Sequence, residues 1–246
     1  MWSIFVAKLE KTYGLSVETS GRVGSVAIGQ EDSVLFESSF SGFMKHSAEL
    51  FDTLTELIDR VGIRPDQIDP LYITVGPGSF TGIRIAVTLA KMMSYAVGSR
   101  VVAVDTLDAL VENVTYTDLK RIAAVLDAKQ NRFFVAIYEK TDTGWKKIHP
   151  NSLLSPDEIL SLIHQDQVQT GLLGEGLVYY ADRFATPLTT VMDASFWSVK
   201  ARHVYAAGHK MAQKGIFSNI YTLFPAYIRK PDAVEKYNQL NDKNKD

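Results

Sequence analysis

Cysteine, a surplus of basic residues and long apolar runs are all missing from this sequence. The lack of cysteine excludes disulfides, thiolate metal sites and cysteine nucleophiles. The 26 Lys and Arg residues face 28 Asp and Glu residues, for a formal charge of −2, whereas a protein that binds nucleic acid alone usually carries a basic surplus. Contact with nucleic acid is therefore expected to be indirect or confined to a local patch. Since no apolar run is long enough to cross a bilayer, we expect no membrane contact. The lack of cysteine fits a reducing compartment, and we expect a cytoplasmic protein.

The first half of the chain reads as three strands followed by alternating helices and strands. Apolar residues alternate with polar ones in three short segments, which predicts an antiparallel meander: Leu15 and Val17, Val26 and Ile28, Val34 and Phe36. Helical spacing then predicts a helix over 46–61, which Gly62 ends. A buried strand over 71–75, a glycine-rich turn, a helix ending at Gly98 and a strand over 101–104 complete this half.

A similar order begins again in the second half. Residues 122–126 and 133–138 predict a hairpin, and Ser155-Pro156-Asp157-Glu158 has the pattern of a capping box that opens a helix. The chain is thus predicted to form two related α/β domains, 14–118 and 119–232, each with a mixed sheet and flanking helices. Residues 1–13 and 233–246 are extensions. The helix near 201–214 is assigned to the second domain, with its return to the first left open.

The turn from Gly76 to Gly82 is the sharpest local signal. Its backbone amides, between a strand and a helix, are placed to hold an anion. It is not a P-loop, because no Lys-Ser or Lys-Thr pair follows, and Thr81 stands where a dinucleotide fingerprint has its third glycine. The residues Gly76, Gly78, Ser79 and Thr81 are therefore candidates for a degenerate phosphate site. The alternative, which we favour, is a tight turn with close helix–sheet packing.

Glu18-Thr19-Ser20 ends the first strand and carries a carboxylate and two hydroxyls. Such a group can hold magnesium and phosphate, but turn chemistry that satisfies backbone groups explains it equally well and is favoured. His46 has Leu50, not histidine, four residues on, so no helical metal pair is present. We expect no metal, no cofactor and no catalytic set.

The segment Tyr72-Ile73-Thr74-Val75-Gly76-Pro77-Gly78-Ser79-Phe80-Thr81-Gly82-Ile83-Arg84 resembles the signature of the TsaB (YeaZ) family. Four further segments agree in order: Val17–Ser20, His46–Leu50, Val125–Lys129 and Pro225–Arg229. The resemblance covers residues 14 to about 232. It implies an actin-like, sugar-kinase-like fold of two related domains. It also implies a non-catalytic subunit of the machinery that forms N6-threonylcarbamoyladenosine beside the anticodon of tRNA.

The resemblance further implies partners: a TsaD-like transferase, a TsaE-like ATPase, and a second copy when the chain is alone. The family builds a helical bundle with TsaD from the helices over 46–61 and 81–97. Both helices carry more apolar residues than one buried face needs, and the surplus gives the partner-binding candidates Phe51, Leu89, Met92, Met93 and Tyr95. Without the family, this surplus would be read as plain core.

A nucleotide-dependent kinase or phosphotransferase of the same fold is the alternative function. Glu18 stands where the fold usually has aspartate, and Gly174-Glu175-Gly176 is a poor substitute for a glycine-rich adenosine loop. Both departures argue against an ordinary ATP site. A nucleotide titration of the isolated chain separates the two hypotheses.

Overall fold

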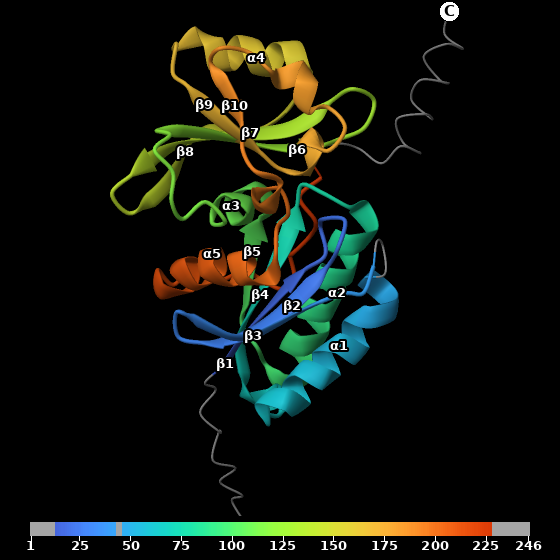
Figure 1. The fold of residues 1–246 in the computed structure, drawn as a ribbon. Coiled ribbons are helices and arrows are strands. Elements are labelled where there is room, and N and C mark those ends of the chain that lie inside the picture. Colours follow the sequence, from blue (N-terminus) through green and yellow to red (C-terminus); the bar gives the residue numbers. More distant parts are fainter. Residues whose placement is uncertain (1–12, 43–45, 228–246) are drawn as a thin grey trace, which may run out of the picture.

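The computed structural model describes residues 13–42 and 46–227, and the predicted extensions fall outside this part except for Tyr13. Two five-stranded sheets lie one above the other (Figure 1). The first has the order β3-β2-β1-β4-β5, with these bounds: β1 Tyr13–Glu18, β2 Ser25–Gln30, β3 Ser33–Ser39, β4 Ile68–Gly76 and β5 Val101–Asp105. The second has the order β10-β9-β6-β7-β8: β6 Arg121–Asp127, β7 Phe133–Thr141, β8 Gly144–Leu154, β9 Thr170–Leu173 and β10 Thr189–Val191.

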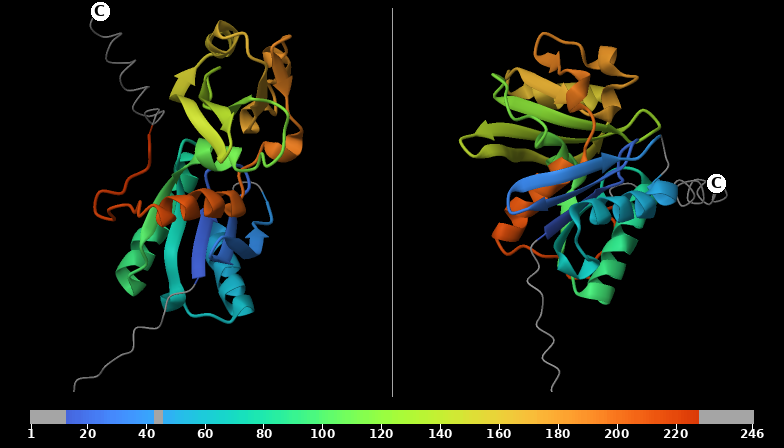
Figure 2. Two further views of the ribbon diagram at one scale, coloured as in Figure 1. Left: turned by 90° about the vertical axis from the view of Figure 1, so that its left-hand side faces the viewer. Right: turned by 60° about the horizontal axis from the view of Figure 1, so that its bottom comes forward.

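Helices pack on the faces of the two sheets and between them. Their bounds are α1 His46–Val61, α2 Phe80–Val97, α3 Thr106–Val111, α4 Pro156–Gln165 and α5 Ala201–Gln213. Helices α1 and α2 cover one face of the first sheet, and α5 lies on its other face (Figure 2, right). Helix α3 lies between the two sheets, and α4 covers the far side of the second sheet (Figure 1). The layer order explains why β1 is buried along nearly its whole length.

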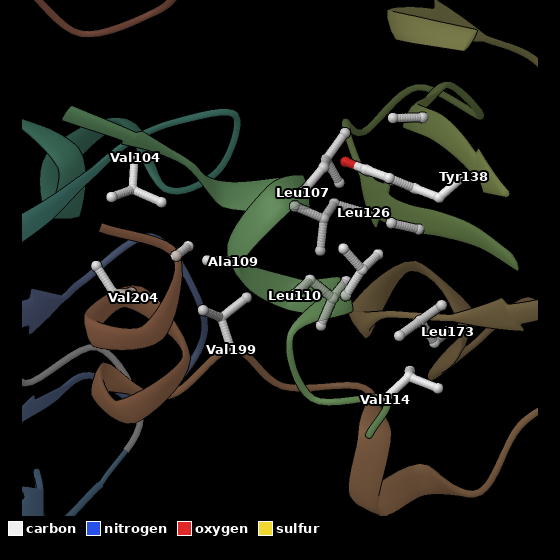
Figure 3. Close-up of a cluster of buried hydrophobic side chains, with 14 of the residues drawn as sticks. Val104, Leu107, Ala109, Leu110, Val114, Leu126, Tyr138, Leu173, Val199 and Val204 are labelled. Carbon is white, nitrogen blue, oxygen red and sulfur yellow. The ribbon is translucent and has the colours of Figure 1, made fainter. Parts of the chain in front are cut away.

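Alternation along β6 divides the core of the second domain. Ala123 and Val125 point toward α4, whereas Ile122, Ala124 and Leu126 point toward the first domain. The latter join α3, α5 and the first sheet in a single interdomain core, part of which is drawn in Figure 3. The two domains are thus joined through a continuous apolar layer and not only through surface contacts.

The ends of the helices agree with their predicted signals. The Ser155 hydroxyl accepts a hydrogen bond from the Glu158 amide at 3.3 Å, and a Glu158 carboxylate oxygen accepts from the Ser155 amide at 2.7 Å, which confirms the capping box. Gly98 ends α2 in the left-handed conformation, with φ of 70°. The predicted helix over 46–61 is also confirmed.

The second domain departs from the predicted repeat after β9. Where the first domain has the long helix α2, the second has short 3₁₀ helices at Glu175–Leu177, Ala181–Phe184 and Ala194–Phe196, and the short strand β10, which the sequence pattern did not reveal. Helix α5 packs on the first sheet. Its Ala201 amide donates to the Ser25 hydroxyl at 2.8 Å, and the Ser16 hydroxyl donates to the Ala201 carbonyl oxygen at 2.8 Å.

Polar contacts add to the junction between the domains. Lys147 of β8 pairs with Asp108 of α3 at 2.8 Å, and Asn151 donates to Asp105. Burial, reinforced by the neighbouring charge of Asp108, raises the pKa of Asp105. Across the described ranges, no helix combines the length and apolar character that crossing a membrane requires.

The capping box of α4 yields a stability prediction. Ser155→Ala removes the acceptor for the Glu158 amide and is expected to lower the free energy of unfolding by about 1 kcal/mol. Ser161→Ala, an exposed change in the interior of the same helix, is the control and should stay within about 0.5 kcal/mol of the parent. Urea denaturation of the two variants measures the difference. Equal effects would contradict the assignment of Ser155 as the cap.

Candidate functional site

The end of β1 packs directly against the glycine-rich turn that starts α2. An added Cβ at Gly82 would lie 1.7 Å from the Thr19 carbonyl oxygen, and one at Gly78 would lie 2.6 Å from that of Ser20. The Thr19 hydroxyl donates to the Gly82 carbonyl oxygen at 2.7 Å, and the Ser79 amide donates to the Ser20 carbonyl oxygen at 2.8 Å. Groups of the chain itself therefore fill the space in which such a turn would hold a phosphate.

Two of the predicted phosphate-site residues face other neighbours. Gly76 has φ of +119°, and an added Cβ would meet the Ala226 carbonyl oxygen at 2.9 Å. It thus lies beside the segment 216–227, whose Ala226 amide donates to the Val75 carbonyl oxygen at 2.7 Å. Thr81 is exposed on the outer side of α2. The structure brings Glu18, Thr19, Ser20, Gly78 and Ser79 together and leaves Gly76 and Thr81 at the edges of this group.

Glu18 is fully buried at the end of β1. Its Oε1 accepts from the Ser20 amide at 2.5 Å, the Ser20 hydroxyl at 2.6 Å and the Gly21 amide at 2.9 Å. Within the described part of the chain, its Oε2 and the Thr74 hydroxyl have no partner in hydrogen-bonding geometry. Burial raises the pKa of Glu18, and the hydrogen bonds and the nearby Thr74 hydroxyl only partly offset this effect.

A second glutamate reaches the same loop from the other domain. The Arg22 amide donates to the Glu175 carboxylate, at 3.1 Å to Oε2 and 3.4 Å to Oε1, and the Ser198 hydroxyl donates to Oε1 at 3.2 Å. Burial raises the pKa of Glu175 as well. Three successive amides, those of Ser20, Gly21 and Arg22, therefore point at carboxylates of the chain. This contact was not predicted from the sequence, because no local pattern links two residues that are 153 positions apart.

These contacts do not fit the nucleotide that the fold implies. The amides that would face its phosphates already have carboxylate acceptors, and Thr19 occupies the close approach at Gly82. Gly174 was considered above as part of a glycine-rich adenosine loop. It lies instead against the second sheet, where an added Cβ would be 2.2 Å from the Val125 carbonyl oxygen. Among residues 13–42 and 46–227, no three acidic or histidine side chains gather around a metal position. The side chain of His46 lies outside the described residues.

Of the predicted partner-binding residues, Phe51, Met92 and Tyr95 lie exposed on the outer side of α1 and α2. Phe51, Met92 and Tyr95 expose 52%, 51% and 65% of their surface, and Met93 is half-buried. A groove of about 310 Å³ runs between the two helices, lined by Phe51, Thr81, Arg84, Ile85, Thr88 and Leu89. We call this groove, together with Met92, the α1–α2 face.

Leu89 corrects the sequence-based expectation. It is 3% exposed and belongs to the core, although the sequence made it a candidate for partner binding. The reason is that α2 packs on the sheet and on α1 at once, so its buried face is wider than a single sheet contact requires. Thr88, one position earlier, is exposed and takes the outward place.

The two mixed sheets and the three-stranded meander in each define a two-domain protein of the actin-like, sugar-kinase-like class. A family model described as "TsaD: tRNA N6-adenosine threonylcarbamoyltransferase" matches residues 41–237. The chain belongs to this family, and within it to the TsaB (YeaZ) proteins.

Curated relatives carry the name tRNA threonylcarbamoyladenosine biosynthesis protein TsaB. The protein from Bacillus subtilis is 22% identical over 91% of this chain and 96% of its own length, and the one from Escherichia coli is 20% identical over 90% and 96%. Solved structures agree in fold. YeaZ from Pseudomonas aeruginosa aligns with a TM-score of 0.75 at 22% identity, over 88% of this chain and 99% of that one.

The contact between Thr19 and Gly82 predicts a large effect of one methyl group. Gly82→Ala forces the strand end away from the helix and is expected to lower the free energy of unfolding by about 3 kcal/mol. Gly215→Ala is the control: it has φ of +74° and open space around it, so only backbone strain of about 1 kcal/mol applies. Chemical denaturation compares the two. A smaller loss at Gly82 than at Gly215 would refute the packing role.

The buried Glu18 carboxyl predicts a pH dependence. Its folded-state pKa is raised above the ordinary 4.5, so the stability it contributes is complete below 4.5 and is lost as pH rises through the raised value. Glu18→Gln cannot ionise, and its stability relative to the parent should therefore increase as the pH rises above 4.5 and through the raised pKa of Glu18. Thermal unfolding across this range measures the difference.

The comparison with the parent removes contributions that both proteins share, including that of His203, whose pKa burial lowers to about 4. Glu56→Gln, an exposed change on α1, is the matched control and should give a curve parallel to that of the parent. A parallel curve for Glu18→Gln would show that Glu18 ionises in the folded protein as easily as in the unfolded chain.

Proposed function

We propose that the chain is a non-catalytic subunit in the biosynthesis of N6-threonylcarbamoyladenosine in tRNA. In this role it binds a TsaD-type transferase through the α1–α2 face and works together with a TsaE-type ATPase. The names of its curated relatives support the pathway. The division between catalysis and binding rests on the contrast between two surfaces of this molecule.

The observation that carries the proposal is a contrast between the loop after β1 and the outer side of α1 and α2. In the loop, the amides of Ser20, Gly21 and Arg22 already have acceptors within the chain. On the outer side, Phe51 and Met92 are each about half exposed beside an apolar groove. Aromatic residues and methionine are enriched in protein interfaces, and exposed apolar clusters of this kind mark binding sites.

A face of this character also suits pairing with a second copy when the transferase subunit is absent. The formal charge of −2 leaves few phosphates that the chain can neutralise, so tRNA is expected to meet this subunit through the complex. The kinase alternative requires an open phosphate cradle, and no contact described above supports one.

The proposal predicts that acidic side chains on α2 abolish partner binding without unfolding the chain. In Thr88→Glu combined with Met92→Glu, both altered positions are exposed, so circular dichroism should match that of the parent. Calorimetric titration with the TsaD-type subunit of the same organism should show affinity reduced by roughly 100-fold or more, because charges replace a desolvated apolar contact.

Ile148→Glu is the matched control, because Ile148 is 41% exposed on β8 of the second domain. This variant is expected to bind as the parent does. If the α2 double variant is folded and retains parental affinity, the transferase subunit binds elsewhere and the proposed role of the α1–α2 face is refuted.

A further inference from the structure

Arg84 is held in place by aromatic rings on the outer side of α2. Its Nε donates to the Tyr227 hydroxyl at 2.9 Å. Its guanidinium lies 4.7 Å from the Phe80 ring centroid and 5.9 Å from that of Tyr227, and the two rings stack at 4.4 Å with 9° between their planes. Cation–π contacts and a hydrogen bond thus restrict a side chain that is otherwise flexible.

The ring that orients Arg84 is itself anchored. Tyr227 follows Ala226, whose amide donates to the Val75 carbonyl oxygen at 2.7 Å. Earlier in the same segment, the Ser218 amide donates to the Val101 carbonyl oxygen at 2.7 Å, and Leu223 is buried in the first-domain core. The segment 216–227 therefore fixes Tyr227 against α2 through contacts that do not involve Arg84.

Arg84 is oriented without an ion pair to any of the described residues, unlike several other arginines of the chain. Arg100 pairs with Asp69, Arg121 with Asp166 and Arg202 with Glu37. For Arg84, no carboxylate of the described residues lies within ion-pair distance, although the side chain is exposed and oriented. An ordered guanidinium of this kind keeps its remaining N–H groups available for a planar acceptor.

Arg84 also lines the groove of the α1–α2 face, next to Phe51 and Ile85. We propose that Arg84 is a binding residue that receives an aspartate or glutamate side chain of the TsaD-type subunit, while an apolar side chain beside that acid fills the groove. Tyr227 is the positioning residue that orients Arg84. This inference rests on the proposed function, since it names the chemistry by which the same face recognises its partner.

The chemistry of the site favours a protein carboxylate over a nucleic-acid phosphate. The groove beside Arg84 is lined mainly by apolar atoms of Phe51, Ile85 and Leu89, which match a buried side chain and not a solvated backbone. Arginine is a frequent energetic centre of protein interfaces when apolar neighbours exclude water around its ion pair. A fixed guanidinium also loses little side-chain entropy when it binds.

The test measures the affinity of the full chain for the TsaD-type subunit of the same organism by titration calorimetry at low and high salt. Arg84→Ala is expected to weaken binding roughly 10- to 100-fold. The loss should shrink as salt rises, because an ionic contact is screened. Arg84→Lys should retain part of the affinity, since it keeps the charge but not the planar fork.

Tyr227→Phe keeps the stacked ring and removes the hydroxyl that accepts from Arg84, and it should weaken binding about threefold. In an Arg84→Ala background the same change should have no further effect, a non-additivity that a merely structural role of Tyr227 would not produce. Arg60→Ala is the matched control. Arg60 also lies 4.7 Å over a ring, that of Phe36, but on the side of α1 away from the groove, and its loss should leave affinity unchanged.

The outcomes separate the two proposals. If the parent chain binds and Arg84→Ala binds equally well, or loses the same affinity at every salt concentration, the carboxylate contact is refuted and the proposed function stands. If Arg84→Ala changes only self-association, the face serves a second copy and the inference is overturned. If the parent chain does not bind the TsaD-type subunit at all, the proposed function fails, and the inference fails with it.

Discussion

The close approach of β1 to the start of α2 is the constraint on which the rest of the first domain depends. Only a residue without Cβ fits at Gly82, because the Thr19 carbonyl oxygen occupies that space. The contact fixes where α2 begins and how it is rotated on the sheet. Ile83, Ala86 and Val87 then face the core, and the next positions around the helix, Arg84, Thr88 and Met92, are left on the outside.

The same contact decides the character of the loop that follows β1. Once Thr19 and Ser20 lie against the turn, the loop after β1 needs acceptors for its amides, and Glu18 and Glu175 supply them. Burying two carboxylates is unfavourable unless hydrogen bonds compensate, and here the compensating donors are backbone groups of the loop. Because Glu175 comes from the second domain, its hydrogen bond to the Arg22 amide also links the two domains.

Sequence patterns predicted the features that depend on residues close together in the chain. The cap at Ser155, the end of α2 at Gly98, the strands of the first meander and the hairpin of β6 and β7 depend on local spacing and backbone preference. The family was identified from a long local motif. Features that depend on distant partners were missed or wrong. Leu89 is buried because α1 adds a second wall, Glu175 matters because it meets Arg22, and the hydrogen bond that orients Arg84 is accepted by Tyr227, 143 residues later.

The end of β1 and the outer side of α2 differ in the binding capacity that they retain. This difference explains how one fold can separate chemistry from recognition. Glu18, Thr19 and Ser20 are buried at the end of β1, and the amides of Ser20, Gly21 and Arg22 already have carboxylate acceptors, so this loop leaves little capacity for a ligand. The residues on the outer side of α2 are ordered by their own neighbours yet retain unused binding capacity: exposed apolar surface at Met92 and an oriented charge at Arg84. Preorganised groups bind with a smaller loss of entropy than mobile ones. The physical basis for recognition in this molecule therefore lies on the helices that cover the sheet, and the strand ends serve to hold those helices in position.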